Sequence, residues 1–262
     1  MESPIITLTT DWGQQDFFAG MVKGKLFGGI PNVRVVDIAH NLPAFNTAHA
    51  TFVVKHGCLG FPKGTIHIID VDTNASLSDN LVVVEHQGQF LICCDNGIPA
   101  LVCGRDFDRA VVIKKESAEH PTFVALDIFC DVAIRLALGS PLETIGTPLE
   151  NLNETPTWQP IMNGNRLEIP VAYADSYGNV MLNITRDEFE KYRQGRPFEI
   201  TILDATINKI EDTYILKSDG IMMNTPILTT SATGYLQIAF FRDSAQRMLG
   251  YSPNDKLIVW FR

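Results

Sequence analysis

Two acidic residues flank a glycine near the N-terminus, where an apolar stretch gives way to a helix-like run. Residues 7–25 read LTTDWGQQDFFAGMVKGKL, and the two carboxylates are those of Asp11 and Asp16. The apolar stretch predicts a buried strand, and ligands of α/β proteins bind beyond the carboxyl ends of such strands. Two carboxylates there can hydrogen-bond the hydroxyls of a sugar diol, hold a metal ion, or cap the following helix.

Further acidic residues stand at the ends of other predicted strands, and they are Asp37, Asp70, Asp72 and Asp95. Any one of them fits a helix cap or a turn, because Asp favours both places. Together they predict a polar site at one edge of a sheet. One hypothesis for this group is a metal-dependent hydrolase that uses Asp11, Asp70, Asp72 and Asp95 as hard oxygen ligands.

A second polar segment, ADSYGNVMLNIT at residues 174–185, gathers Asp175, Tyr177 and Asn179 around Gly178. An aromatic ring can stack on a nucleobase while an amide two positions later hydrogen-bonds the edge of the base. A β-hairpin turn explains the same residues equally well.

Other titratable residues favour structural interpretations. His67 lies inside an apolar strand, where a core histidine with satisfied hydrogen bonds is the expected state, whereas His40 follows a strand end and could line a pocket. Asp127, Asp131 and Arg135 recur every four residues, which predicts helix capping and an i,i+4 ion pair. The HExxH, GxSxG, GxGxxG and GxxxxGK[ST] signatures do not occur in the sequence.

The hydrophobic patterns change character along the chain. Strand-like and helix-like segments alternate in the first half, which predicts an α/β domain at 1–150 with a mostly parallel sheet flanked by helices. A Pro-, Asn- and Thr-rich stretch at 151–166 is typical of a linker. Short β-like segments follow and predict a smaller all-β, barrel-like domain at 167–262.

Composition limits which classes of partner the protein is expected to bind and indicates its cellular compartment. The formal net charge is −9 and the basic residues are scattered, which argues against nucleic acid and anionic membrane as partners. The five cysteines form no CxxC motif, which favours free thiols in a reducing cytoplasm. The opening MESPIITLTT resembles no signal peptide and no 18-residue apolar run occurs, so we expect a cytoplasmic protein.

Five motifs, taken together, resemble the S-adenosylmethionine (SAM) hydroxide adenosyltransferase family, which includes SAM-dependent fluorinases and chlorinases. The motifs, in the family's order from residue 5 to about residue 240, are TTDWGQQDFFAGMVKG, VVDIAH, FPKGTIHIIDVD, CDNG and DSYGNVMLNIT. The resemblance implies a homotrimer whose sites lie between the N-terminal domain of one subunit and the C-terminal domain of its neighbour. It also implies that SAM is substrate or ligand, with no separate cofactor and no metal.

The resemblance assigns roles to individual residues. It implies that Asp11 binds the ribose hydroxyls and that Asp16 occupies the second acidic position of the same motif. Phe45 matches an aromatic residue near the adenosyl group. Tyr177 and Asn179 match the aromatic residue and the amide that hold adenine.

The water-activating half of the motif set departs from the family pattern. In the family an Asp, an Arg and a His form this set, and here Asp72 keeps the Asp while Asp79 and Val124 stand at the other two positions. SATG at residues 231–234 replaces the family's Asn-Ser-x-Gly. The leading hypothesis is a divergent SAM hydrolase in which Asp72 orients the water. The alternative is a non-catalytic module that binds adenosine or SAM.

Overall fold

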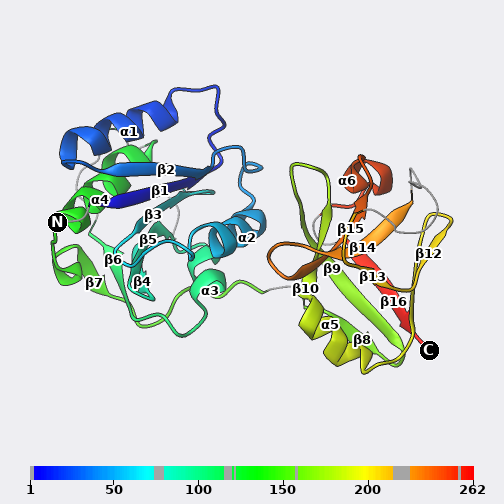
Figure 1. The fold of residues 1–262 in the computed structure, drawn as a ribbon. Helices are drawn as coiled ribbons and strands as arrows, with labels where there is room; N and C mark the ends of the chain where they lie inside the picture. The colour runs from blue at the N-terminus through cyan, green and yellow to red at the C-terminus, as the bar shows by residue number, and fades with distance from the viewer. Residues whose placement is uncertain are drawn as a thin grey trace. The chain divides into compact units, whose positions relative to one another are not determined.

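The computed structural model describes residues 3–73, 80–114, 120, 122–156, 159–214, 225–252 and 255–262. The chain divides into two compact units, Met1–Thr155 and Pro156–Arg262 (Figure 1). Within the segment predicted as a linker, the strand β8 occupies Ile161–Asn163.

The first unit is built on a seven-stranded sheet with the order β2-β1-β3-β5-β4-β6-β7. The strands are β1 (Ile5–Thr10), β2 (Arg34–Ala39), β3 (Ile66–Asp70), β4 (Leu81–His86), β5 (Gln89–Cys94), β6 (Arg109–Ile113) and β7 (Gly146–Pro148). Three neighbouring pairs are parallel and three are antiparallel.

The prediction of a mostly parallel sheet is therefore wrong, and the sheet is mixed. Strands β4 and β5 are joined by a two-residue turn in which Gln87 and Gly88 have φ of 54° and 77°. Such a turn forms an antiparallel hairpin, because a parallel connection needs a crossover of a dozen or more residues.

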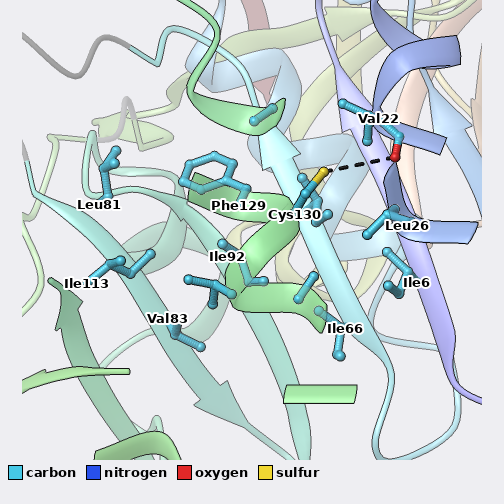
Figure 2. Close-up of a cluster of buried hydrophobic side chains, with 14 of the residues drawn as sticks. Ile6, Val22, Leu26, Ile66, Leu81, Val83, Ile92, Ile113, Phe129 and Cys130 are labelled. Atoms are coloured by element: carbon cyan, nitrogen blue, oxygen red, sulfur yellow. Dashed lines mark hydrogen bonds between the residues drawn. The ribbon is translucent and has the colours of Figure 1, made fainter. Parts of the chain in front are cut away.

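Helices cover both faces of this sheet. On one face, α1 (Phe18–Gly29), the π-helical turn η1 (Ala125–Phe129) and α4 (Cys130–Ala137) pack into one core, and the short 3₁₀ helix η2 spans Leu142–Thr144. Figure 2 shows Phe129 and Cys130 of this core, with the Cys130 thiol 3.9 Å from the Val22 carbonyl oxygen. On the other face, α2 (Thr47–Gly57) and α3 (Ile98–Cys103) pack over a second core.

Three neighbouring strands of the parallel half, β2, β1 and β3, end at the same edge. Thr10 of β1 is opposite Asp70 of β3, and Thr9 is opposite Ala39 of β2. The residues that follow these strands therefore lie close together, as the sequence pattern predicts for a site at a sheet edge.

The second unit contains a nine-stranded, strongly curled sheet with a separate hydrophobic core. Eight strands run in the order β12-β11-β16-β9-β10-β15-β14-β13, and β8 pairs with β9. They are β8 (Ile161–Asn163), β9 (Arg166–Ala174), β10 (Val180–Thr185), β11 (Phe198–Ile202), β12 (Ala205–Ile207), β13 (Ile210–Glu211), β14 (Pro226–Thr230), β15 (Tyr235–Phe240) and β16 (Lys256–Phe261).

Two helices, α5 (Arg186–Arg193) and α6 (Ala245–Leu249), correct the prediction that this unit is all-β. Helix α5 begins with a capping box, in which Thr185 and Glu188 each bond the backbone N–H of the other. Among the described residues of the whole chain, no helix is long and apolar enough to cross a membrane.

Candidate functional site

Asp11 follows β1 directly and presents a half-buried carboxylate at the sheet edge. Its Oδ2 accepts a hydrogen bond of 2.9 Å from the backbone N–H of Phe45. Phe45 has φ of 62° and leaves 74% of its surface exposed. The structure therefore brings Asp11 and Phe45 together, whereas Asp16 lies exposed in the loop that leads to α1.

Trp12 connects the end of β1 to the end of β3. Its indole N–H donates a 2.7 Å hydrogen bond to Asp70, whose side chain is buried. The ring stacks on His40 at 6.0 Å between centroids and meets the edge of Phe123 at 5.2 Å. The pKa of Asp70 is raised to about 6, mainly by burial and to a smaller extent by the charge of Asp11, although hydrogen bonds with Thr73 and Trp12 oppose the shift.

His40, at the end of β2, is held by its neighbours. Its Nδ1 lies 2.8 Å from the Thr10 hydroxyl, and its carbonyl oxygen accepts a 2.7 Å bond from the N–H of Gly13. Its Nε2 lies 3.1 Å from Asp37, which also forms a 2.6 Å ion pair with Lys23. Burial raises the pKa of Asp37, but the bonds with Lys23 and His40 outweigh burial and lower that pKa overall.

Asp72 and Asp95 hold different places in the loops after β3 and β5. Asp72 has φ of 51°, and its carbonyl oxygen accepts a 3.3 Å bond from the Asn96 amide. Asp95 is buried and accepts a 3.0 Å bond from the N–H of Asn153, so its carboxylate ties two chain segments together.

The hypothesis of a metal-dependent hydrolase receives no support from this arrangement. Within the described parts of the chain, no group of three or more His, Cys, Asp or Glu residues could hold a metal ion. The role of Asp95 in bonding Asn153 explains one member of the predicted ligand set without a metal.

Asp79 and Val124 stand at the two positions where the sequence departs from the family pattern, and the structure describes only one of them. Asp79 lies outside the described residues. Val124 is 6% exposed and packs in the core beneath α1 and α4, immediately before η1. Its side chain therefore contributes to packing in the first unit.

The charged residues of η1 and α4 have partners outside these two helices. Asp131 pairs with Lys25 of α1 at 2.8 Å, and Arg135 donates a 2.7 Å bond to the carbonyl oxygen of Thr144. The predicted i,i+4 ion pair between Asp131 and Arg135 is therefore wrong, because tertiary partners take both side chains. Asp127 lies 3.1 Å from the His120 ring.

In the second unit, Asp175 organises the loop between β9 and β10. Its carboxylate accepts 2.9 Å bonds from the backbone N–H groups of Tyr177 and Asn179, and a 2.8 Å bond from the Asn179 amide. Gly178 sits in the same loop with φ of 81°. The hairpin interpretation of this segment is thus correct, and the turn leaves Tyr177 83% exposed.

The same loop lines a cavity of about 670 Å³. The lining residues are Ser176, Tyr177, Asn179, Tyr214, Phe240, Phe241, Arg242, Asp243, Ser244 and Arg247. Four of them are aromatic, which suits a flat heterocyclic ligand. Among them, Arg247 pairs with Asp243 at 2.5 Å, and the Arg242 guanidinium lies 5.3 Å from the Phe241 ring centroid.

Sequence reasoning missed the second half of this lining, which comes from β15 and the turn after it. The available signal was the run FFRDS at residues 240–244, two aromatic residues followed by a charged turn. No local pattern links this run to Tyr177, because about sixty residues separate the two in the chain.

The fold and its polar regions define a class of protein with two units, an α/β unit that has an acidic sheet edge and a curled β unit that has an aromatic cavity. The chain belongs within it to the SAM hydroxide adenosyltransferase family, whose N-terminal and C-terminal domain models match residues 6–146 and 169–258. The resemblance inferred from the motifs is confirmed.

Individual relatives agree with this assignment. The (R)-S-adenosyl-L-methionine hydrolase of Methanocaldococcus jannaschii is 25% identical, with 97% of this chain and 95% of that protein covered. The protein of the same name from Salinispora arenicola is 30% identical over 70% of this chain and 73% of its own. A crystal structure of an uncharacterized conserved protein from Thermotoga maritima shares the fold, with a TM-score of 0.85, 23% identity and coverage of 97% and 99%.

Proposed function

We propose that this protein hydrolyses SAM to adenosine and methionine. The observation that carries the proposal is that both domain models of the family match, so the likeness extends over the acidic sheet edge and the aromatic cavity. The two relatives described above are both named SAM hydrolases and support the same reaction.

The adenosyl group would be held by residues from both units. Asp11 offers two carboxylate oxygens for the ribose diol, with Phe45 beside it and Asp16 in the same loop. Tyr177 lines the aromatic cavity with an exposed ring that can stack on adenine, and Asn179 lines it with an amide. These roles follow the family resemblance and suit the chemistry of each side chain.

The reaction itself asks little of acid–base catalysis. Water forms a bond to C5′ of the ribose while the C5′–S bond breaks. The electron pair of the broken bond stays on sulfur, so methionine leaves as a neutral thioether. The water loses one proton to solvent. Such a displacement depends mainly on an in-line, desolvated nucleophile. We assign the orientation of that water to Asp72, at a fixed turn after β3.

We further propose a homotrimer in which each site joins the first unit of one subunit to the second unit of its neighbour. This assembly would unite Asp11 and Tyr177, which lie in different units of the chain. Light scattering coupled to size-exclusion chromatography tests the trimer directly. We also propose a cytoplasmic location, in keeping with five buried cysteines that form no disulfide.

The central test incubates the purified protein with SAM and separates the products by chromatography. Adenosine and methionine should accumulate in equal amounts, in proportion to enzyme concentration and above the uncatalysed background. Asp72→Asn is the matched variant, because it keeps the size of the side chain and removes its charge. If adenosine binds tightly and SAM stays intact, the chain is the non-catalytic module instead.

A further inference from the structure

We propose that Asp70 is a positioning residue for the ligand site, acting through Trp12 to fix where Asp11 presents its carboxylate. The identity of the ligand rests on the proposed function. The coupling between Asp70, Trp12 and Asp11 concerns only the residues of this chain. Asp70 is 7% exposed, so it is poorly placed to contact a ligand itself.

The first step is the anchor between Asp70 and Trp12. The 2.7 Å bond from the Trp12 indole uses the one hydrogen-bonding group of that ring. His40 covers one face of the indole and Phe123 meets it edge-on. With packing on the ring and a hydrogen bond at its tip, the orientation of Trp12 is defined on several sides.

The second step is the short covalent path from Trp12 to Asp11. The two residues are adjacent in sequence, immediately after β1 ends at Thr10. On the other side of Trp12, the N–H of Gly13 donates to the His40 carbonyl oxygen at 2.7 Å. A shift of the Trp12 ring would therefore move the backbone from which the Asp11 carboxylate extends.

The third step is a hydrogen bond through which the position of Asp11 can be measured. Its Oδ2 accepts the N–H of Phe45 at 2.9 Å. Loss of the anchor at Asp70 should weaken this bond, although Asp70 is the last residue of β3 and Phe45 lies in the loop between β2 and α2. The protection of the Phe45 amide from hydrogen exchange is therefore a direct measure of the coupling, with no ligand present.

The experiment compares Asp70→Ala, Asp70→Asn and Trp12→Phe in the full chain. Ala removes the acceptor, Asn keeps an acceptor oxygen without the charge, and Phe removes the donor but keeps a ring against His40 and Phe123. We expect Phe45 amide protection to fall about threefold to thirtyfold in the Ala and Phe variants and to be restored in Asp70→Asn. Asp131→Asn, which alters a surface ion pair with Lys25, is the matched control and should leave the protection of the Phe45 amide unchanged.

Adenosine affinity, measured by calorimetry, should follow the same pattern. The double variant of Asp70→Ala and Trp12→Phe should lose no more affinity than the weaker-binding single variant, because both changes cut one connection. Additive losses would mean that Asp70 contacts the ligand independently, which overturns the proposal.

Other outcomes are equally decisive. Unchanged Phe45 protection in folded Trp12→Phe overturns the proposal, and this variant serves even if Asp70→Ala does not fold. Failure of Asp70→Asn to restore protection overturns the hydrogen-bond mechanism. A parent protein that binds no adenosine contradicts the proposed function, while the exchange measurement still decides the role of Asp70.

Discussion

A single residue at the sheet edge can hold the backbone and still offer acceptors to a ligand. Asp11 is the clearest case, because one oxygen already accepts the Phe45 N–H while the carboxylate remains half-buried at the edge. A carboxylate can accept several hydrogen bonds, so the bond with Phe45 leaves capacity for a ribose diol. Structural and ligand-binding roles of Asp11 are therefore compatible.

Replacing Asp11 tests the ribose assignment. We expect Asp11→Ala to weaken adenosine binding by roughly 1.5–3 kcal/mol, or about tenfold to more than a hundredfold, because the diol loses a charged acceptor. Asp11→Asn should lose less, since one acceptor oxygen remains. Calorimetry with adenosine measures both variants, with Asp131→Asn as the control. If Asp11→Ala binds adenosine with the affinity of the parent, Asp11 does not bind the ribose, and its only role here is the bond with Phe45.

Elements position the cavity of the second unit, and the β9–β10 loop does so through close backbone packing. Gly178 has φ of 81°, and a Cβ at this position would stand 2.0 Å from the Ser244 hydroxyl oxygen and 2.9 Å from the Ser244 Cα. The N–H of Gln246 also donates a 2.8 Å bond to the Gly178 carbonyl oxygen. The loop and the start of α6 therefore require a glycine where they meet.

Gly178→Ala should destabilise the second unit by roughly 2–5 kcal/mol, since left-handed strain and a clash with Ser244 add together. Gly164→Ala is the matched control, because Gly164 has φ of 61° but nothing within 4 Å of its Cβ position. This variant should show the left-handed strain alone, roughly 1–2 kcal/mol. Urea unfolding monitored by circular dichroism compares the two variants. Equal losses in the free energy of unfolding would rule out a contribution from the contact with Ser244.

At the scale of the whole molecule, each unit has its own core, and the first contains a buried histidine. His67 is fully buried, with Nδ1 2.7 Å from the Thr7 hydroxyl and Nε2 3.1 Å from the Gln89 side-chain oxygen. Since that oxygen only accepts, Nε2 carries the proton and Nδ1 accepts from Thr7. Burial lowers the pKa of His67 to about 4, against a usual 6.5, although the bond with Gln89 opposes the shift.

This shift predicts how stability depends on pH. Below about pH 6.5 the unfolded chain binds a proton at His67 that the folded chain refuses until about pH 4, so stability falls across that window as pH falls. The loss is up to roughly 3 kcal/mol, at about 1.4 kcal/mol per pKa unit. Above pH 6.5 the term is constant.

Urea unfolding at pH 7, 5.5 and 4.5 measures the effect, with His67→Asn as the variant that cannot titrate. The variant should be less stable at pH 7 but lose less on acidification. Asp70 acts in the opposite direction, because its pKa is raised to about 6 and its protonation favours the folded state. The difference between parent and variant isolates His67, and parallel pH profiles would contradict its assigned role.

Local sequence determined much of this protein, including the strand that leads to Asp11, the hairpin turn around Gly178 and the order of the family motifs. These features depend on residues close together in the chain, where periodicity and turn chemistry act directly. Family membership followed because the motifs retain their order even where single positions differ.

Tertiary structure alone decided the rest. The direction of β6 beside β4 depends on where the chain returns to the sheet after α3, and hydrophobic runs read the same in parallel and antiparallel strands. The bond between Trp12 and Asp70 joins residues 58 positions apart. Phe240 lines the same cavity as Tyr177 because β15 pairs with β10, with Ile238 opposite Val180. Such contacts are set by the path of the whole chain, because no local pattern encodes which distant side chain will be the partner.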